Sequence, residues 1–342
     1  MSGLAIIGCG ARTPLGFDRV SSAAAVRAGI SAIAEHPFMI DRFGAPMKVT
    51  RDAGLDPVLA GAERLAALAL PAAVEALEGV TEPGRIAVVV SFGEVRPGQA
   101  SGVAQEVAEQ LQAGLAERVQ ISQVVPWMGG HAGGIAAMEA GAKLIAQGRA
   151  DAVLAGGVES YLNPETLEWL DETEQLHSEE NIYGFCPGEA AGFVLMARAG
   201  AGDAAPLVGV TATGSGHEEN LIGTEDICLG EGLAAAFHGA AAGLQEGEAV
   251  DQIICDMNGE RYRGNEYGFA VLKSSGLFRN AAEFEAPADC WGDVGAASGP
   301  LYAALVIEAE ARGYAKGPLS LIWGSSQAGQ RSAALLRRRE GG

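Results

Sequence analysis

A histidine follows a pair of glycines near the middle of the chain, where the sequence predicts a turn into a buried helix. The glycines are Gly129 and Gly130, and the next residue is His131. A glycine pair allows a sharp turn that a Cβ would resist. Several hydrolases and acyl transferases present a nucleophile on such a turn. Here the presented side chain is an imidazole, which can act as a base but cannot match the stable acyl intermediate of a thiolate.

The segment after His131 predicts a helix and then a strand. Apolar residues recur at helical spacing from Ile135 to Ile145, and Gly148 ends the helix. Residues 152–155 are a short apolar run typical of a buried strand. Similar strands and helices alternate along the chain, which predicts a layered α/β fold.

The chain divides into two similar halves. Near residues 200–203 the composition shifts to Gly, Ala and Asp, and the alternation begins again with a predicted strand at residues 207–213. Each half also ends with a strand, a glycine turn and a closing strand. We therefore expect an N-terminal half over residues 1–200 and a C-terminal half over residues 201–342, with sites near the seam between them.

Composition and charge argue against several classes of partner. Of the 342 residues 48% are hydrophobic, and 23 Lys+Arg against 43 Asp+Glu give a net charge of −20. That charge disfavours nucleic acid and anionic membrane surfaces. The first strand starts at Leu4 without a signal peptide before it, and no apolar run is long enough to cross a bilayer. These features predict a cytoplasmic protein with no membrane partner.

The sequence shows no pattern for a metal or a cofactor. The five cysteines include no CxxC pair, and the histidines lack metal-binding spacing, so we expect no zinc site and no disulfide framework. Gly8, Gly10 and Gly16 follow a strand, but their spacing does not fit a dinucleotide fingerprint. In the turn at residues 188–192, we expect Glu189 to satisfy buried backbone groups.

Six stretches spread along nearly the whole chain share motifs with one family of enzymes. They are GCGARTPLG with RAGISAI, HAGGIAAMEAGAKLIAQGRADAVLAGGVES, YGFCPGEAAGFVLMAR, VDQIICDMNGERYRGNE, CWGDVGAASGP and GSSQAGQRSAALLRR. Together they resemble the β-ketoacyl-acyl-carrier-protein synthases of the thiolase superfamily, and the third, similar to DGF…GEGAG, is the most specific. The resemblance implies a thiolase-like five-layer αβαβα fold built from two similar halves, and a homodimer.

The catalytic residues of that family do not carry over to this chain. The position of the nucleophilic cysteine falls on His131. The two catalytic histidines fall on Asn258 and Asp293, judged from the glycine beside each of them. The active-site lysine falls near Ala288, and the gating phenylalanine falls on Ala328.

These replacements bear directly on the family's reaction. Decarboxylative condensation needs a thiolate to carry the acyl chain, and donors to stabilise the enolate and the oxyanion. Asn258 can still donate a hydrogen bond, but an ionised Asp293 repels the malonyl carboxylate and the developing enolate. We therefore expect a degenerate relative that acts as a binding partner, scaffold or accessory protein, in a biosynthetic or secretion-system locus.

Two roles for His131 remain open at this point. In the favoured one, it fills the vacated cysteine site, hydrogen-bonded to Asn258 or Asp293, and the protein is not an enzyme. In the other, Asp293 orients His131 as a base, as a carboxylate does in hydrolytic triads, and with Asn258 they support acyl transfer or hydrolysis. Cys290 and Ser298 lie near the same loop in the sequence, although neither is placed as a clear nucleophile.

The resemblance also predicts how the chain meets partners and ligands. We expect a homodimer joined along the strand at residues 119–125, because family members pair the strand before the nucleophile turn and an exposed apolar edge is costly. We expect no strong binding of acyl carrier protein, because carrier and chain are both acidic. Any pocket should be blocked, or small, polar and bounded by His131, Asn258 and Asp293, since burying an acyl chain past such groups is unfavourable.

Overall fold

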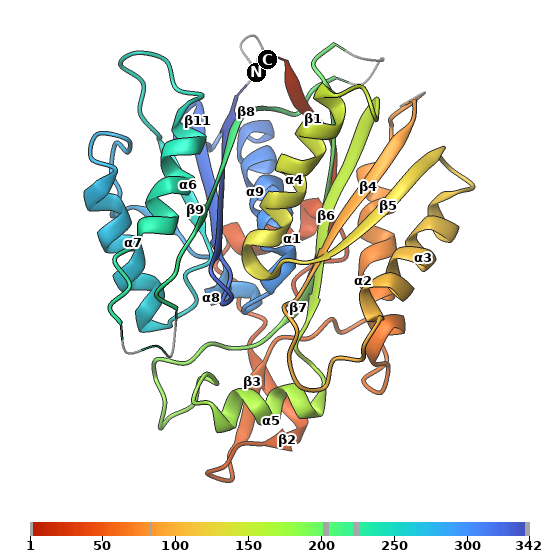
Figure 1. The fold of residues 1–342 in the computed structure, drawn as a ribbon. Helices are drawn as coiled ribbons and strands as arrows, with labels where there is room; N and C mark the ends of the chain where they lie inside the picture. Colours follow the sequence, from red (N-terminus) through yellow and green to blue (C-terminus); the bar gives the residue numbers. More distant parts are fainter. Residues whose placement is uncertain (1–2, 82–83, 201–204, 222–223, 225, 339–342) are drawn as a thin grey trace.

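The structure is a computed structural model that describes residues 3–81, 84–200, 205–221, 224 and 226–338. Its main feature is a sheet with the strand order β10-β9-β11-β12-β8-β1-β7-β6-β4-β5 (Figure 1). In chain order these strands are β1 (Leu4–Arg12), β4 (Ile86–Phe92), β5 (Ile121–Met128), β6 (Ala152–Ser160), β7 (Glu189–Arg198), β8 (Val208–His217), β9 (Gln252–Cys255), β10 (Phe284–Glu285), β11 (Leu319–Ser325) and β12 (Gln330–Arg337). Strands β2 (Ala34–Ile40) and β3 (Pro46–Val49) form a separate hairpin.

The long sheet lies on both sides of two central helices. Its two halves join where β1 pairs with β8, at Ala5–Gly209 and Ile6–Val208. Helices α4 (Gly130–Ala146) and α9 (Ser298–Ala311) contact strands of both halves. They are apolar on nearly every face, as a helix covered on all sides must be.

Two outer layers of helices complete the fold. Helices α2 (Gly61–Ala76) and α3 (Val103–Leu115) pack on the outer face of the N-terminal strands, and α6 (Glu231–Ala241) and α7 (Arg261–Lys273) pack outside the C-terminal strands (Figure 1). The resulting αβαβα order confirms the predicted five-layer architecture.

A small cap at one end of the sheet was not predicted from the sequence. It consists of β2, β3 and α5 (Pro164–Glu172), and its core is a cluster of buried apolar side chains: Met47, Val49, Tyr161, Leu167, Leu170, Leu176 and Phe185. The remaining helices are α1 (Arg19–Arg27), α8 (Ala288–Trp291) and a 3-10 turn at Gly295–Ala297. The cap matters for the site because α5 helps to enclose His131, as described below.

Two boundaries can be compared with the sequence predictions. The strand expected at residues 119–125 begins two residues later, and β5 continues through Met128. Residues 201–204, which include most of the predicted seam, lie outside the described residues. Within the described ranges, no helix combines the length and apolar character that a membrane span requires.

Strand β5 is the last strand of the sheet, and its free edge leads to a prediction about assembly. Val125 is 40% exposed on this strand, whose other edge pairs with β4. We expect a homodimer through β5, and we expect Val125→Lys to give a monomer because the charge would be buried at the interface. Light scattering after size exclusion would measure the mass, with Val58→Lys, the same substitution at an 80% exposed site, as control. A wild-type monomer at micromolar concentration would contradict this prediction.

Candidate functional site

The turn before α4 positions His131 as the glycine pair predicts. Gly130 has φ +58°, in the left-handed region, and a Cβ there would lie 2.7 Å from the carboxylate of Glu94. The backbone N–H of Gly129 donates to the carbonyl of Phe92 at 3.1 Å, which ties the turn to the end of β4. His131 therefore lies in the first turn of α4, and its side chain is almost completely buried.

The imidazole of His131 faces the carboxylate of Asp293. Its Nε2 atom lies 2.8 Å from both Oδ1 and Oδ2 of Asp293, which is 4% exposed. Asn258 donates from Nδ2 to Asp293 Oδ2 at 2.6 Å, and the backbone N–H of Gly295 donates to Oδ1 at 2.9 Å. The structure thus brings together His131, Asn258 and Asp293, three residues that are far apart in the sequence.

The segment that most resembles the ketosynthase motif holds the Asp293 loop in place. The N–H of Asp293 donates to the carbonyl of Cys186 at 2.8 Å, and the N–H of Gly188 donates to the carbonyl of Asp293 at 2.9 Å. Gly292 precedes Asp293 with φ +75°, and a Cβ there would lie 2.6 Å from Thr50 Oγ1. The loop therefore has little freedom to move Asp293 away from His131.

Arg263 completes the site from helix α7, and the sequence analysis missed it. Its Nη2 lies 3.3 Å from His131 Nε2, while Nη1 donates to Asp256 at 2.7 Å and Nε donates to Glu260 at 3.0 Å. All of these charges are buried. The run DMNGERYR around Asn258 carried a signal, because Asp256, Glu260 and Arg263 are charges concentrated beside a predicted buried strand.

The electrostatics favour an ion pair between His131 and Asp293. Burial lowers the pKa of His131, but the Asp293 carboxylate outweighs burial and the nearby Arg263, so that pKa is raised overall. Burial likewise opposes the ionised form of Asp293, yet His131, Arg263 and the Asn258 hydrogen bond hold the pKa of Asp293 well below its usual range. Both shifts favour a proton on the imidazole and a charge on the carboxylate, so the pairing stabilises the ionised forms of the two side chains.

This pair predicts a pH dependence of stability with a definite sign. The pKa of Asp293 is lowered from 3.8, so its contribution is complete above pH 3.8 and is lost as the pH falls. The pKa of His131 is raised from 6.5, so its contribution is complete below pH 6.5 and is lost as the pH rises through the folded-state pKa. We expect the stability difference between wild type and His131→Gln to shrink as the pH rises above 6.5, measured by urea unfolding over a series of pH values. A difference that stays constant as the pH rises would mean that the pKa of His131 is not raised in the folded protein.

The cavity beside His131 is small and polar. Its volume is about 30 Å³, and its walls include Glu94, Arg96, Glu159 and Tyr161, with Trp169 and Leu170 of α5 and Gln327. Ligand pockets usually measure about 300–1,000 Å³. The expected small polar pocket is present, but Asn258 and Asp293 lie behind His131 and do not line it. No acyl chain fits in this space.

The loop that carries the gating position in the family is held by Glu94. The backbone N–H groups of Gln327 and Ala328 donate to the two carboxylate oxygens of Glu94 at 2.9 and 2.7 Å. Ala328 itself is exposed, and Gln327 covers the cavity instead. At the position of the family's lysine, Ala288 begins α8 and offers no charge.

Glu189 behaves as the sequence predicts, and it forms a second buried network. One oxygen accepts from the backbone N–H of Asp52 at 2.9 Å, and the two oxygens accept from Arg64 at 2.6 and 2.7 Å. Ser160 Oγ donates to the same carboxylate at 2.9 Å. The network ties β7 to α2 and to the β6 end, so its role is structural.

Neither of the nucleophiles near Asp293 in the sequence reaches His131. Cys290 Sγ lies against the carbonyl of Val26, and buried Ser298 bonds with Tyr302. His131 Nδ1 has no hydrogen-bond partner among the described residues. Neither Cys290 nor Ser298 is therefore placed as the nucleophile of a triad with His131.

Comparisons with known proteins agree with this fold. Residues 129–201 match the profile of the β-ketoacyl synthase N-terminal domain. The ishigamide ketosynthase/chain length factor superposes with a TM-score of 0.74 at 22% identity, covering 98% of this chain and 99% of that one. A β-ketoacyl synthase from Burkholderia phymatum gives 0.75 at 16% identity over 99% and 100%. No curated protein sequence matches the chain.

A third similar structure belongs to a complex. The structure is described as a type II polyketide synthase acyl-carrier protein in complex with its ketosynthase bound to the hexaketide. The matching chain of that structure has a TM-score of 0.77 at 15% identity, over 99% of this chain and 100% of that one. At these identities the comparisons establish the thiolase-like ketosynthase fold. What the chain does has to be inferred from the residues of its own site.

Proposed function

We propose that the chain is a catalytically degenerate relative of the β-ketoacyl synthases that acts as a binding partner, scaffold or accessory protein. The observation that carries the proposal is the buried ion pair at the nucleophile position, in which both oxygens of Asp293 lie 2.8 Å from His131 Nε2. A thiolate nucleophile is absent there, and the imidazole that replaces it is already paired. The cavity of about 30 Å³ leaves no space for an acyl substrate.

The surface supports a protein partner more than a carrier-bound substrate. The free edge of β5 exposes Val125, and an unpaired strand edge favours association with another chain. The net charge of −20 disfavours an acidic carrier protein. We infer that a second copy of this chain binds at β5, and that the dimer then acts as a scaffold or accessory subunit.

The alternative, an acyl-transfer or hydrolytic enzyme that uses His131 with Asp293 and Asn258, has less support. A general base must be neutral and within reach of a nucleophile. The pKa of His131 is raised, against burial, by its pairing with Asp293, so the ring keeps its proton up to a higher pH than a free histidine does. Ser326 Oγ, at the same turn, is occupied because it donates to the carbonyl of Gly129 at 2.6 Å and accepts from the N–H of Ala132 at 2.9 Å.

Intact-mass spectrometry tests this proposal directly. After incubation with acyl and malonyl thioesters, we expect the protein to show no acyl adduct that depends on His131, because no free nucleophile faces the cavity. His131→Gln is the control, since adducts on the half-buried cysteines will appear equally in both proteins. A stable adduct on wild type that is missing from His131→Gln would refute the non-catalytic role.

A further inference from the structure

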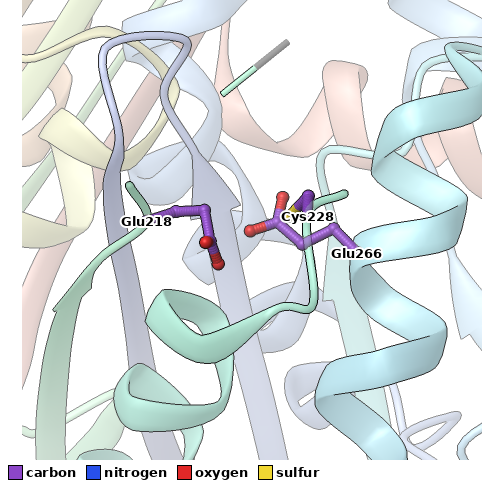
Figure 2. Close-up of side chains that lie close together, drawn as sticks. All are labelled: Glu218, Cys228 and Glu266. Atoms are coloured by element: carbon purple, nitrogen blue, oxygen red, sulfur yellow. The ribbon is translucent and has the colours of Figure 1, made fainter. Parts of the chain in front are cut away.

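Three residues that could bind a metal meet on the outer side of the C-terminal half, away from His131. Glu218 follows β8, Cys228 lies three residues before α6, and Glu266 lies on α7 (Figure 2). One oxygen or sulfur atom from each residue lies within 4.8 Å of the others. Both glutamates are buried, and Cys228 is half-buried. Figure 2 shows all three side chains directed toward one another.

The hydrogen bonds around the cluster leave it short of positive charge. Glu218 Oε2 accepts from the backbone N–H of Gly232 at 3.1 Å, and Glu266 Oε1 accepts from Arg331 Nε at 2.5 Å. Among the residues that the structure describes, Arg331 is the one basic side chain paired with either glutamate. Of the two buried carboxylates, Glu266 alone has a basic partner among the described residues.

One carboxylate oxygen of the cluster has no hydrogen-bond partner among the described residues. This oxygen is Oε2 of Glu266, a residue that is 0% exposed, so water cannot replace the missing partner. An unpaired carboxylate oxygen in the interior is unfavourable and requires either a proton or a cation.

We propose that Glu218, Cys228 and Glu266 bind a divalent transition-metal ion of the zinc class. One thiolate with two carboxylates suits zinc and its neighbours, whereas calcium and magnesium take oxygen ligands alone. Metal–ligand bonds of about 2.0–2.3 Å at tetrahedral angles place ligand atoms about 3.6 Å apart. Side-chain rotations that move the ligand atoms by about 1 Å would bring the observed spacing of up to 4.8 Å to this value. The thiol releases its proton to solvent on binding. A water molecule takes the fourth position.

The contacts of Arg331 indicate a structural role for the ion. Arg331 donates from Nη1 to the carbonyl of Ser326 at 2.5 Å, and the Ser326 hydroxyl holds the turn between Gly129 and Ala132. A metal bound by Glu218 and Glu266 would therefore connect the end of β8 with α7 and, through Arg331 and Ser326, with the turn that holds His131. No zinc site was expected from the sequence, because the five cysteines include no CxxC pair and the histidines lack metal-binding spacing.

Metal titration of the full chain, freed of metal with a chelator, tests the site. We expect calorimetry to detect one Zn²⁺ per chain, and Co²⁺ to give a thiolate-to-cobalt absorption band in the near ultraviolet. Cys228→Ser should abolish the band, and Cys228→Ser and Glu266→Gln should each weaken Zn²⁺ binding tenfold or more. Cys186→Ser, at another half-buried cysteine, and Glu231→Gln, on the neighbouring exposed turn, are the matched controls and should bind as wild type does.

Three outcomes would overturn the site. The first is a wild-type chain that binds neither Zn²⁺ nor Co²⁺. The second is binding that survives in both Cys228→Ser and Glu266→Gln. The third is a cobalt spectrum without a thiolate band, which would place the ion elsewhere. Thermal unfolding with and without Zn²⁺ separates loss of binding from loss of fold, because a folded Cys228→Ser variant should keep its unfolding temperature but gain nothing from Zn²⁺.

Discussion

Replacing Arg263 with methionine is expected to lower the free energy of unfolding by about 3–5 kcal/mol, the usual cost of removing one partner from a buried ion pair. Arg263 is 1% exposed, and its guanidinium bridges Asp256, Glu260 and the carbonyl of Ser325. Without it, two carboxylates remain buried with no counter-ion. Methionine fills a similar volume, so the loss would come from charge and hydrogen bonding rather than from a cavity.

The matched control for that experiment is Arg261→Met on the same helix. Arg261 is exposed, and its guanidinium lies 4.3 Å from the ring centre of Tyr183, so its loss should cost less than about 1 kcal/mol. Chemical denaturation of the three proteins at neutral pH measures both effects. Equal losses for the two variants would mean that the charges around Arg263 are not ionised in the folded protein.

The fold and the position of His131 could be predicted because local patterns determine them. The glycine pair, the small residues of α4 and the buried strand β6 follow one another without interruption, so the turn has one position in the sequence. Asp293 could be located for a similar reason, since Gly292 precedes it and a run of small residues follows it. The structure confirms the five layers that these motifs imply.

The partners of His131 could not be predicted in the same way. Arg263 reaches the site across the seam from α7, and a buried arginine looks the same in a sequence as an exposed one. The direction of its side chain depends on how α7 packs against β9 and β11, which is a tertiary property. The same limit hid Glu94, which reaches the loop after β11 from the end of β4.

The metal cluster and the cap show two further limits. Glu218, Cys228 and Glu266 converge because three parts of the C-terminal half meet there. These parts are the end of β8, the segment that precedes α6, and helix α7. The cap could not be predicted because β2 is mostly exposed, without a regular apolar pattern, and β3 has only four residues. In both cases the information lies in contacts between distant segments rather than in periodicity.

The second large effect concerns His131→Cys, which restores the residue type of the family's nucleophile. We expect this variant to show no condensation of malonyl thioesters and to lose about 3–5 kcal/mol of stability, because the buried Asp293 carboxylate loses its imidazole partner. The new thiol would face the Asp293 carboxylate, and a like charge raises the pKa of a thiol and keeps it protonated. Asp293 also supplies no donor for an oxyanion.

The size of the cavity makes this prediction stronger than the charge argument alone. Cysteine is smaller than histidine, but the walls formed by Arg96, Glu159 and Tyr161 stay in place, with Arg96 stacked 4.2 Å from the ring centre of Tyr161. An acyl chain would have to displace the Arg96–Glu159 ion pair, whose atoms lie 2.5 Å apart in the interior. Intact mass and product analysis of His131→Cys, beside wild type, give the measurement. Condensation by this single variant would show that only the thiol had been lost, and would contradict the inference that Asp293 and the small cavity prevent the reaction.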